Sequence, residues 1–146
     1  MKGSMINILE EKYTTLLTEA KHADSKRKEL MKKFIVYACN ELSIEKPWPK
    51  VSINNKEGFG PHYKSFGYFD VGDNKIVVAS SNRNLGDMLR TLAHELVHYK
   101  QKQDGAINLN NATETGADGS EIENEANAKA GVLLRKFGRD NPDIYE

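Results

Sequence analysis

The sequence predicts a small α+β fold in which a few short strands pack against amphipathic helices. Apolar residues recur at helical spacing in the first third of the chain and again in its second half. Between these regions, residues 51–79 are rich in β-branched and aromatic side chains, and prolines precede them. Strands grouped between amphipathic helices are typical of an α+β domain built around one core.

The length and composition fit a single domain. The chain has 146 residues, of which 38% are hydrophobic and 29% charged, enough for one modest core. We expect residues 5–146 to form this domain and residues 1–4, which precede a second methionine, to be a remnant of cloning. No apolar run is long enough to span a bilayer, which argues against a membrane protein.

The charge balance and the cysteine content narrow the possible partners and compartment. The 21 basic residues equal the 21 acidic residues in number, so no global basic field favours nucleic acid as a partner. Cys39 is the single cysteine, which excludes an intrachain disulfide, and we expect it to be buried. No stretch has the pattern of a signal peptide, so we expect a cytoplasmic protein.

The N-terminal half predicts two helices followed by a small sheet. Amphipathic periodicity covers residues 6–17 and 26–42. Three short strands are predicted from the composition, at residues 51–53, 67–71 and 75–79. The Gly-Asp-Asn sequence at 72–74 supplies a turn, so the last two strands should form a hairpin.

The C-terminal half predicts two longer helices. One covers residues 85–103, with Asn82 available as its cap. A polar stretch at 104–119 is longer than ordinary connections, and such loops are often functional lids. The last helix is expected over 120–137 and should end at Gly138.

The first of these helices carries His94-Glu95-Leu96-Val97-His98. Histidines at i and i+4 lie about 40° apart around a helix, so both imidazoles can reach one metal ion. Zinc suits neutral imidazole nitrogen, and a catalytic zinc site keeps one position for water. Glu95 would then accept a proton from that water. The competing interpretation is a solvated helix face that carries two histidines, because both lie opposite the apolar stripe.

A catalytic zinc needs a third protein ligand, and the last helix offers three glutamates. The apolar stripe of that helix places Glu123 on its inward side, whereas Glu121 and Glu125 lie beyond the edge of the stripe. A carboxylate turned toward a core requires a partner, and the two histidines provide one.

Two alternatives for this glutamate stay open. Ser120-x-x-Glu123 also fits a capping box, in which the glutamate side chain returns to the backbone of the cap residue. Because helix starts are uncertain by a residue or two, Glu125 is a second candidate ligand. Asp118 and His62 follow if neither glutamate binds the metal.

The motif formed by these residues resembles that of a known family. His94-Glu95-x-x-His98, followed by Glu123-Asn124-Glu125-Ala126-Asn127, resembles the gluzincin branch of zinc metallopeptidases, especially the small ImmA/IrrE-type peptidases. The resemblance implies a zincin-like minidomain with Zn²⁺ as cofactor. It assigns the third ligand to Glu123 and the orientation of a ligating histidine to Asn127.

A wider run is similar to short phage-encoded metallopeptidases. It extends from residues 67–70 through Arg83, the two histidines and Gln101 to Ile144-Tyr145. This similarity implies the cytoplasm of a bacterial host if the chain is phage-encoded. The chain has Ala128-Lys129 where an aromatic residue is common in ImmA-like peptidases, so their repressor-cleaving activity is not carried over.

The function we expect is zinc-dependent hydrolysis of a peptide bond in a protein or peptide substrate, with Glu95 as general base. In the zincin arrangement the substrate adds beside an edge strand, which we assign to residues 75–79. The alternative is a non-catalytic zinc-binding module that docks a partner protein. Structural zinc sites usually include cysteine ligands, and a single cysteine favours an open site.

The residue that would stabilise the oxyanion is less well defined. Tyr63, Tyr68 and His62 could each supply a donor. Tyr99 falls on the apolar stripe of its helix, so we expect it in the core.

Overall fold

The structure is a computed structural model that describes residues 25–54, 66–70, 72–106 and 120–145. The helix expected over residues 6–17 and most of the predicted loop lie outside the described residues. The same holds for three candidate site residues, which are His62, Tyr63 and Asp118.

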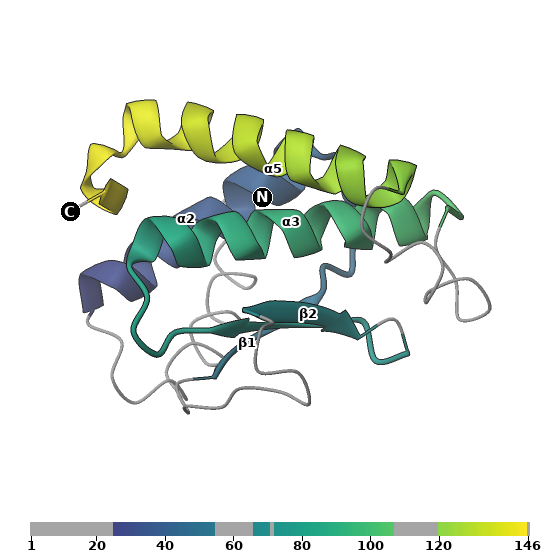
Figure 1. Ribbon diagram of the computed structural model, residues 1–146, viewed down its shortest axis with the longest axis horizontal. Helices are drawn as coiled ribbons and strands as arrows, with labels where there is room; N and C mark the ends of the chain where they lie inside the picture. The colour runs from purple at the N-terminus through teal and green to yellow at the C-terminus, as the bar shows by residue number, and fades with distance from the viewer. Residues whose placement is uncertain (1–24, 55–65, 71, 107–119, 146) are drawn as a thin grey trace, which may run out of the picture.

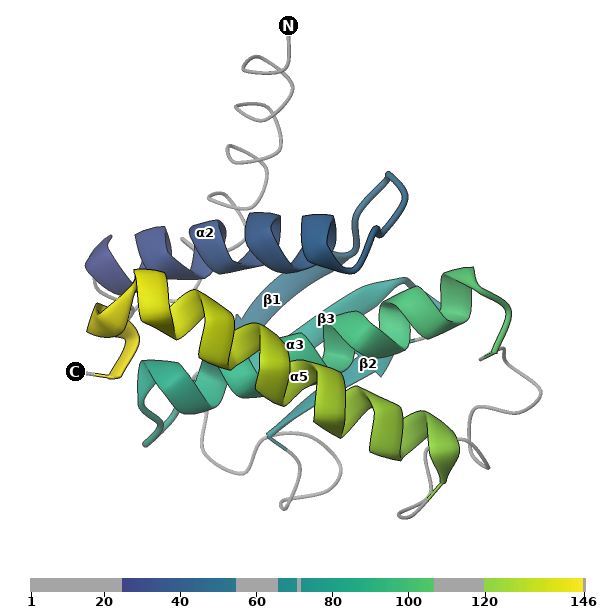
Figure 2. The same ribbon diagram turned by 90° about the horizontal axis from the view of Figure 1, so that it is seen from above.

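The described elements form a helical layer on a small sheet. In Figure 1 the sheet lies below helix α3 (Leu85–Gln103), and helix α5 (Glu121–Asp140) lies above α3. Figure 2 shows α2 (Ser25–Glu41) beside α5, on the same side of the sheet. A short 3₁₀ turn, η1 (Pro142–Tyr145), is the last described element. The predicted fold class, a small α+β zincin-like domain, is confirmed.

The sheet contains three strands in the order β1-β3-β2, namely β1 (Lys50–Asn54), β2 (Gly67–Asp70) and β3 (Lys75–Ala79). β1 pairs with β3 in parallel, and β2 pairs with β3 antiparallel, which confirms the predicted hairpin. β3 is therefore the central strand, and its assignment as an edge strand for substrate was wrong. Its apolar run Ile76-Val77-Val78-Ala79 is buried on both faces, as expected for a central strand.

The core lies between the sheet and the three helices. It takes Ile76 and Val78 from the helix-facing side of β3, while Val77 and Ala79 form a separate small cluster on the opposite face. Helix α2 contributes residues at helical spacing, namely Leu30, Met31, Phe34, Ile35, Ala38 and Cys39. Cys39 and Tyr99 are both buried, as predicted. No described helix combines the length and the apolar content needed to cross a membrane.

Helix α3 has the predicted bounds but a different cap. The Oδ1 atom of Asn84 accepts a hydrogen bond from the Asp87 N–H at 2.8 Å, so Asn84 and not Asn82 is the N-cap. Asn82 has φ of 57° and lies in the turn before the helix. Asparagine tolerates this left-handed conformation, which makes it suitable for the turn.

Helix α5 runs past the predicted end at Gly138 and ends at Asp140, with Asn141 as its C-cap. A Cβ atom at Gly138 would lie 2.6 Å from the hydroxyl oxygen of Tyr145 in η1. The glycine therefore leaves room for the ring of Tyr145 against the helix, instead of ending the helix.

A second glycine, Gly67, allows β2 to lie close against α3. A Cβ atom at Gly67 would lie 2.5 Å from Thr91 Cγ2 and 2.8 Å from the carbonyl oxygen of Val77. We expect Gly67→Ala to lower the free energy of unfolding by about 1–3 kcal/mol, because the strand must move away from the helix.

The matched control is Gly131→Ala in helix α5, where no atom lies within 4 Å of the new Cβ. We expect it to raise the free energy of unfolding by about 0.5–1 kcal/mol, since alanine is the better helix former. Urea denaturation of both variants measures these changes, and equal stability of the two would contradict the packing of β2 on α3.

Candidate metal centre

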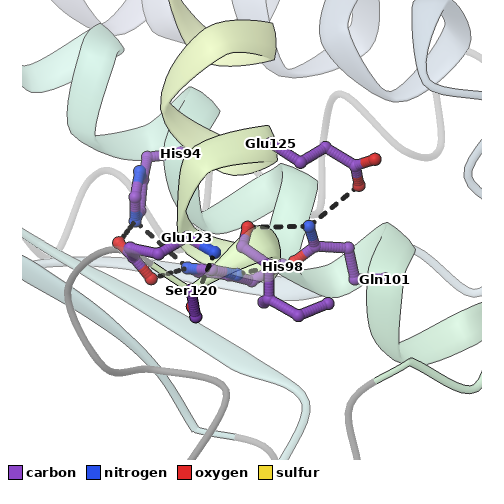
Figure 3. Close-up of polar contacts among 7 residues, drawn as sticks. His94, His98, Gln101, Ser120, Glu123 and Glu125 are labelled. Atoms are coloured by element: carbon purple, nitrogen blue, oxygen red, sulfur yellow. Dashed lines mark hydrogen bonds and ion pairs between the residues drawn. The ribbon is translucent and has the colours of Figure 1, made fainter.

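Helix α3 places His94 and His98 on the face that α5 covers (Figure 3). The sequence correctly places them opposite the stripe that packs on the sheet, but this face is not solvated, because α3 lies between the sheet and α5. His98 is only 9% exposed. The interpretation of the two histidines as residues of a solvated helix face is therefore wrong.

Glu123 comes from the first turn of α5 and meets both imidazoles. Its Oε1 atom lies 2.6 Å from Nε2 of His94, and its Oε2 atom lies 3.2 Å from Nε2 of His98. The two Nε2 atoms are 3.1 Å apart. The structure thus brings together the three residues predicted as metal ligands, with one ligand atom from each within 4.8 Å of the others.

This cluster fits a tetrahedral cation in spacing and in chemistry. Ligand atoms bound at the usual zinc distances lie about 3.3 Å from one another, close to the separations observed. Two imidazoles and one carboxylate are also a donor set of catalytic zinc sites, which leave one position open. Burial lowers the pKa of His94 and the neighbouring His98 lowers it further, although Glu123 and Asn127 act in the opposite direction. A neutral imidazole is the form that binds metal.

The capping box predicted from the sequence would use the side chain of Glu123, whereas the observed cap uses its backbone N–H. The Oγ atom of Ser120 accepts a hydrogen bond from the backbone N–H of Glu123 at 3.1 Å, so Ser120 is the N-cap of α5. The carboxylate of Glu123, however, lies against the two histidines. The capping of the helix and the formation of the cluster are therefore compatible.

Glu125 and Asn127, the other two α5 residues considered from the sequence, lie beside the cluster. The Oε1 atom of Glu125 accepts a hydrogen bond from the amide of Gln101 at 2.9 Å, and its Oε2 atom lies 3.7 Å from Lys129 Nζ. Asn127, one turn after Glu123, hydrogen-bonds the side chain of His94. The described contacts therefore favour Glu123 over Glu125 as the third ligand.

Sequence reasoning gave no role to Gln101, which is 3% exposed beside the cluster. Its Oε1 atom is 2.8 Å from Nδ1 of His98, and its amide donates to the backbone oxygen of Ile122 at 3.0 Å. The available signal was its position, since i+3 places it on the same side of α3 as His98.

Glu95 is buried in helix α3 and 8% exposed. Burial, with the negative charge of Glu123 as the smaller cause, raises the pKa of Glu95 from 4.5 to about 8. A carboxyl group that titrates near pH 8 beside a candidate cation site is suited to proton transfer.

Arg83 holds β2, an outer strand of the described sheet, close to the face of α3 that carries the two histidines. This guanidinium donates to Thr91 Oγ1 at 2.8 Å, one turn before His94, and to the carbonyl oxygen of Phe66 at 3.4 Å. It also lies 4.5 Å from the ring centroid of Phe66. Tyr68 is 41% exposed on the same strand, and its role at an oxyanion stays a prediction.

Comparison with known families supports the geometry. The model of the IrrE N-terminal-like domain, a peptidase family, matches residues 52–135. The chain belongs to this family. The match includes all three residues of the cluster and Glu95, and it confirms the ImmA/IrrE resemblance. No curated protein and no solved structure matches the chain.

Substitution of single glutamates in α5 tests the ligand assignment. Glu123→Gln should weaken zinc binding by more than the ~10–100-fold typical of losing an outer hydrogen-bond partner, because a neutral amide replaces an anionic ligand. Glu125→Gln is the matched control, and it should keep zinc binding, since its amide oxygen can still accept from Gln101. Competition with a chromophoric chelator measures both affinities, and loss of zinc in the control alone would assign the ligand to Glu125.

The raised pKa of Glu95 predicts how the stability of the metal-free protein depends on pH. The folded chain keeps the Glu95 proton up to about pH 8, whereas the unfolded chain has lost it at much lower pH. The stability that this protonation contributes is lost as the pH rises toward 8. The free energy of unfolding should fall between about pH 7 and 8, by at most ~1.4 kcal/mol per pH unit.

The glutamine in Glu95→Gln has no proton to lose in this pH range. The free energy of unfolding of this variant should therefore not show the decline due to Glu95. Because the pKa of His94 is lowered from 6.5, its own contribution makes the free energy of unfolding rise with pH, and both proteins share this contribution. Urea denaturation of the metal-free proteins across the window gives the two slopes, and identical slopes would show that Glu95 is not buried as described.

Proposed function

We propose that the protein is a zinc-dependent metallopeptidase that hydrolyses peptide bonds. The observation that carries the proposal is the convergence of His94, His98 and Glu123 beside the buried Glu95, in a chain of a peptidase family. The two histidines and Glu123 would hold the zinc ion. Among the described residues this set offers three ligands, which suits a site with a position left open for water.

In this proposal the chain supplies the proton transfer and the ion supplies charge. When bound, zinc acidifies water and polarises a carbonyl group. Glu95 accepts the proton of the attacking water and returns it to the departing amine. The burial of Glu95 supports this role, because a carboxyl group kept from bulk solvent has a pKa close to the working pH. Asn127 keeps the His94 ring in place through its hydrogen bond.

We place the substrate, a protein or peptide segment, along the edge strand β2 (Gly67–Asp70) and not along β3. β3 is paired on both sides, whereas β2 is an outer strand of the described sheet. An extended peptide can add to such an edge through main-chain hydrogen bonds. Arg83 and the close contact at Gly67 keep this strand against the helix that carries the cluster.

A non-catalytic zinc module is the alternative, and the position of Cys39 argues against it. Structural zinc sites are usually closed by four ligands that include cysteine. Cys39 is fully buried in α2, and burial raises the pKa of its thiol to about 12. The thiolate form that binds zinc is therefore suppressed.

Replacement of the proposed base separates catalysis from metal binding. Glu95→Gln should retain zinc and the fold but lose at least ~100-fold in peptide hydrolysis, because glutamine cannot accept the proton. The assay combines zinc content, circular dichroism and cleavage of a peptide library by the zinc-loaded protein. Cleavage at the wild-type rate by this variant would refute the proposed mechanism, and zinc binding without cleavage by the wild type would favour the docking module.

A further inference from the structure

We propose that Gln101 is a positioning residue that sets the tautomer of His98 and thereby presents its Nε2 atom as a metal ligand. The inference rests on the proposed metal site and deepens it. The supporting feature is a continuous chain of hydrogen bonds that links the ring of His98, the amide of Gln101 and the carboxylate of Glu125 (Figure 3).

The orientation of the Gln101 amide follows from its partners on α5. Two oxygen atoms face the same end of the amide, the carbonyl oxygen of Ile122 at 3.0 Å and Oε1 of Glu125 at 2.9 Å. A backbone carbonyl and a carboxylate accept hydrogen bonds, so this end must be the NH₂ group. The opposite end, at 2.8 Å from Nδ1 of His98, is therefore the carbonyl oxygen.

A carbonyl oxygen at Nδ1 decides which nitrogen of the neutral ring carries the proton. Only an N–H can donate to this oxygen, so Nδ1 is protonated and Nε2 keeps its lone pair. Nε2 is also the atom that faces Nε2 of His94 and Oε2 of Glu123. The lone pair of His98 thus points at the position where the other two ligand atoms meet.

The same side chain couples the two helices of the site. Gln101 lies one turn after His98 in α3, whereas Ile122 immediately precedes Glu123 in α5. Its hydrogen bonds therefore connect a ligand from one helix to the backbone beside the ligand from the other. Because Gln101 is 3% exposed, water does not readily replace these bonds if the amide is lost.

The tautomer is read directly from long-range ¹H–¹⁵N NMR spectra of the metal-free wild-type protein, at a pH where the imidazole is neutral. We expect His98 to carry its proton on Nδ1. A proton on Nε2 would overturn the inference. This readout does not depend on hydrolysis or on zinc, so it remains valid if the proposed peptidase function fails.

Zinc affinity tests the consequence of this arrangement. Gln101→Leu should bind zinc about 10–100-fold more weakly than the wild type, the range typical for an outer partner of a metal ligand. The matched control is Gln103→Leu, two residues further along α3. Gln103 is exposed and exchanges two hydrogen bonds with the backbone of Glu45, away from the cluster, whereas the buried Gln101 makes three. The control should lose stability and keep the zinc affinity of the wild type.

An exchange of the two side chains provides a test that does not depend on how well the leucine variant folds. Gln101→Glu keeps an acceptor for His98 but sets two carboxylates against each other. Adding Glu125→Gln restores a donor to this carboxylate, so the double variant should recover part of the zinc affinity lost in Gln101→Glu, while the carbonyl oxygen of Ile122 still lacks its donor. Zinc affinity of a folded Gln101→Leu equal to that of the wild type, or zinc affinity of Gln101→Glu equal to that of the wild type, would refute the role of Gln101 and leave the peptidase proposal intact.

Discussion

The contact between α3 and α5 is the constraint on which the rest of the structure depends. It brings a carboxylate from one helix to within 3.2 Å of two imidazole nitrogens from the other. Such proximity requires the helices to approach closely, and the buried face of α5 begins with two small residues, Ala126 and Ala130. The sheet packs on one face of α3, and the opposite face, which carries the histidines, is covered by α5. The layers therefore lie in the order sheet, α3, α5 (Figure 1).

The residues of the site could be predicted from spacing because helical geometry is local. The i, i+4 relation of His94 and His98 and the inward position of Glu123 depend on one helix at a time. Gln101 could not be assigned in this way, because two of its three partners lie on α5 and an amide fits many environments. Which groups meet its NH₂ end is decided by the packing of two helices that are distant in sequence.

The fold shows the same division between local and long-range information. The bounds of α3 and β3 follow from composition and periodicity, and the hairpin follows from its turn. The position of β1 does not, because a parallel partner of β3 is brought in from far along the chain. Because β1 pairs with one side of β3 and β2 with the other, β3 has no edge to which a peptide could add. The edge proposed for the substrate therefore belongs to another strand. Gly138 was misinterpreted for a related reason, since its contact with Tyr145 forms only when the C-terminal turn packs back on α5.

The charged side chains at the site differ in burial and in partners from those on the rest of the described helices. Elsewhere the charged side chains of the described helices are largely at the surface, but Glu95 is nearly buried, and Glu123 turns toward two imidazole rings and not toward a lysine or arginine. Each arrangement opposes folding of the metal-free chain, through desolvation at Glu95 and through the lone pair of His98 facing a carboxylate. A divalent cation held by these residues would relieve both, because it would supply the positive charge that the described residues lack at this point. The stability of the fold and the affinity for the ion are therefore properties of the same few contacts between α3 and α5.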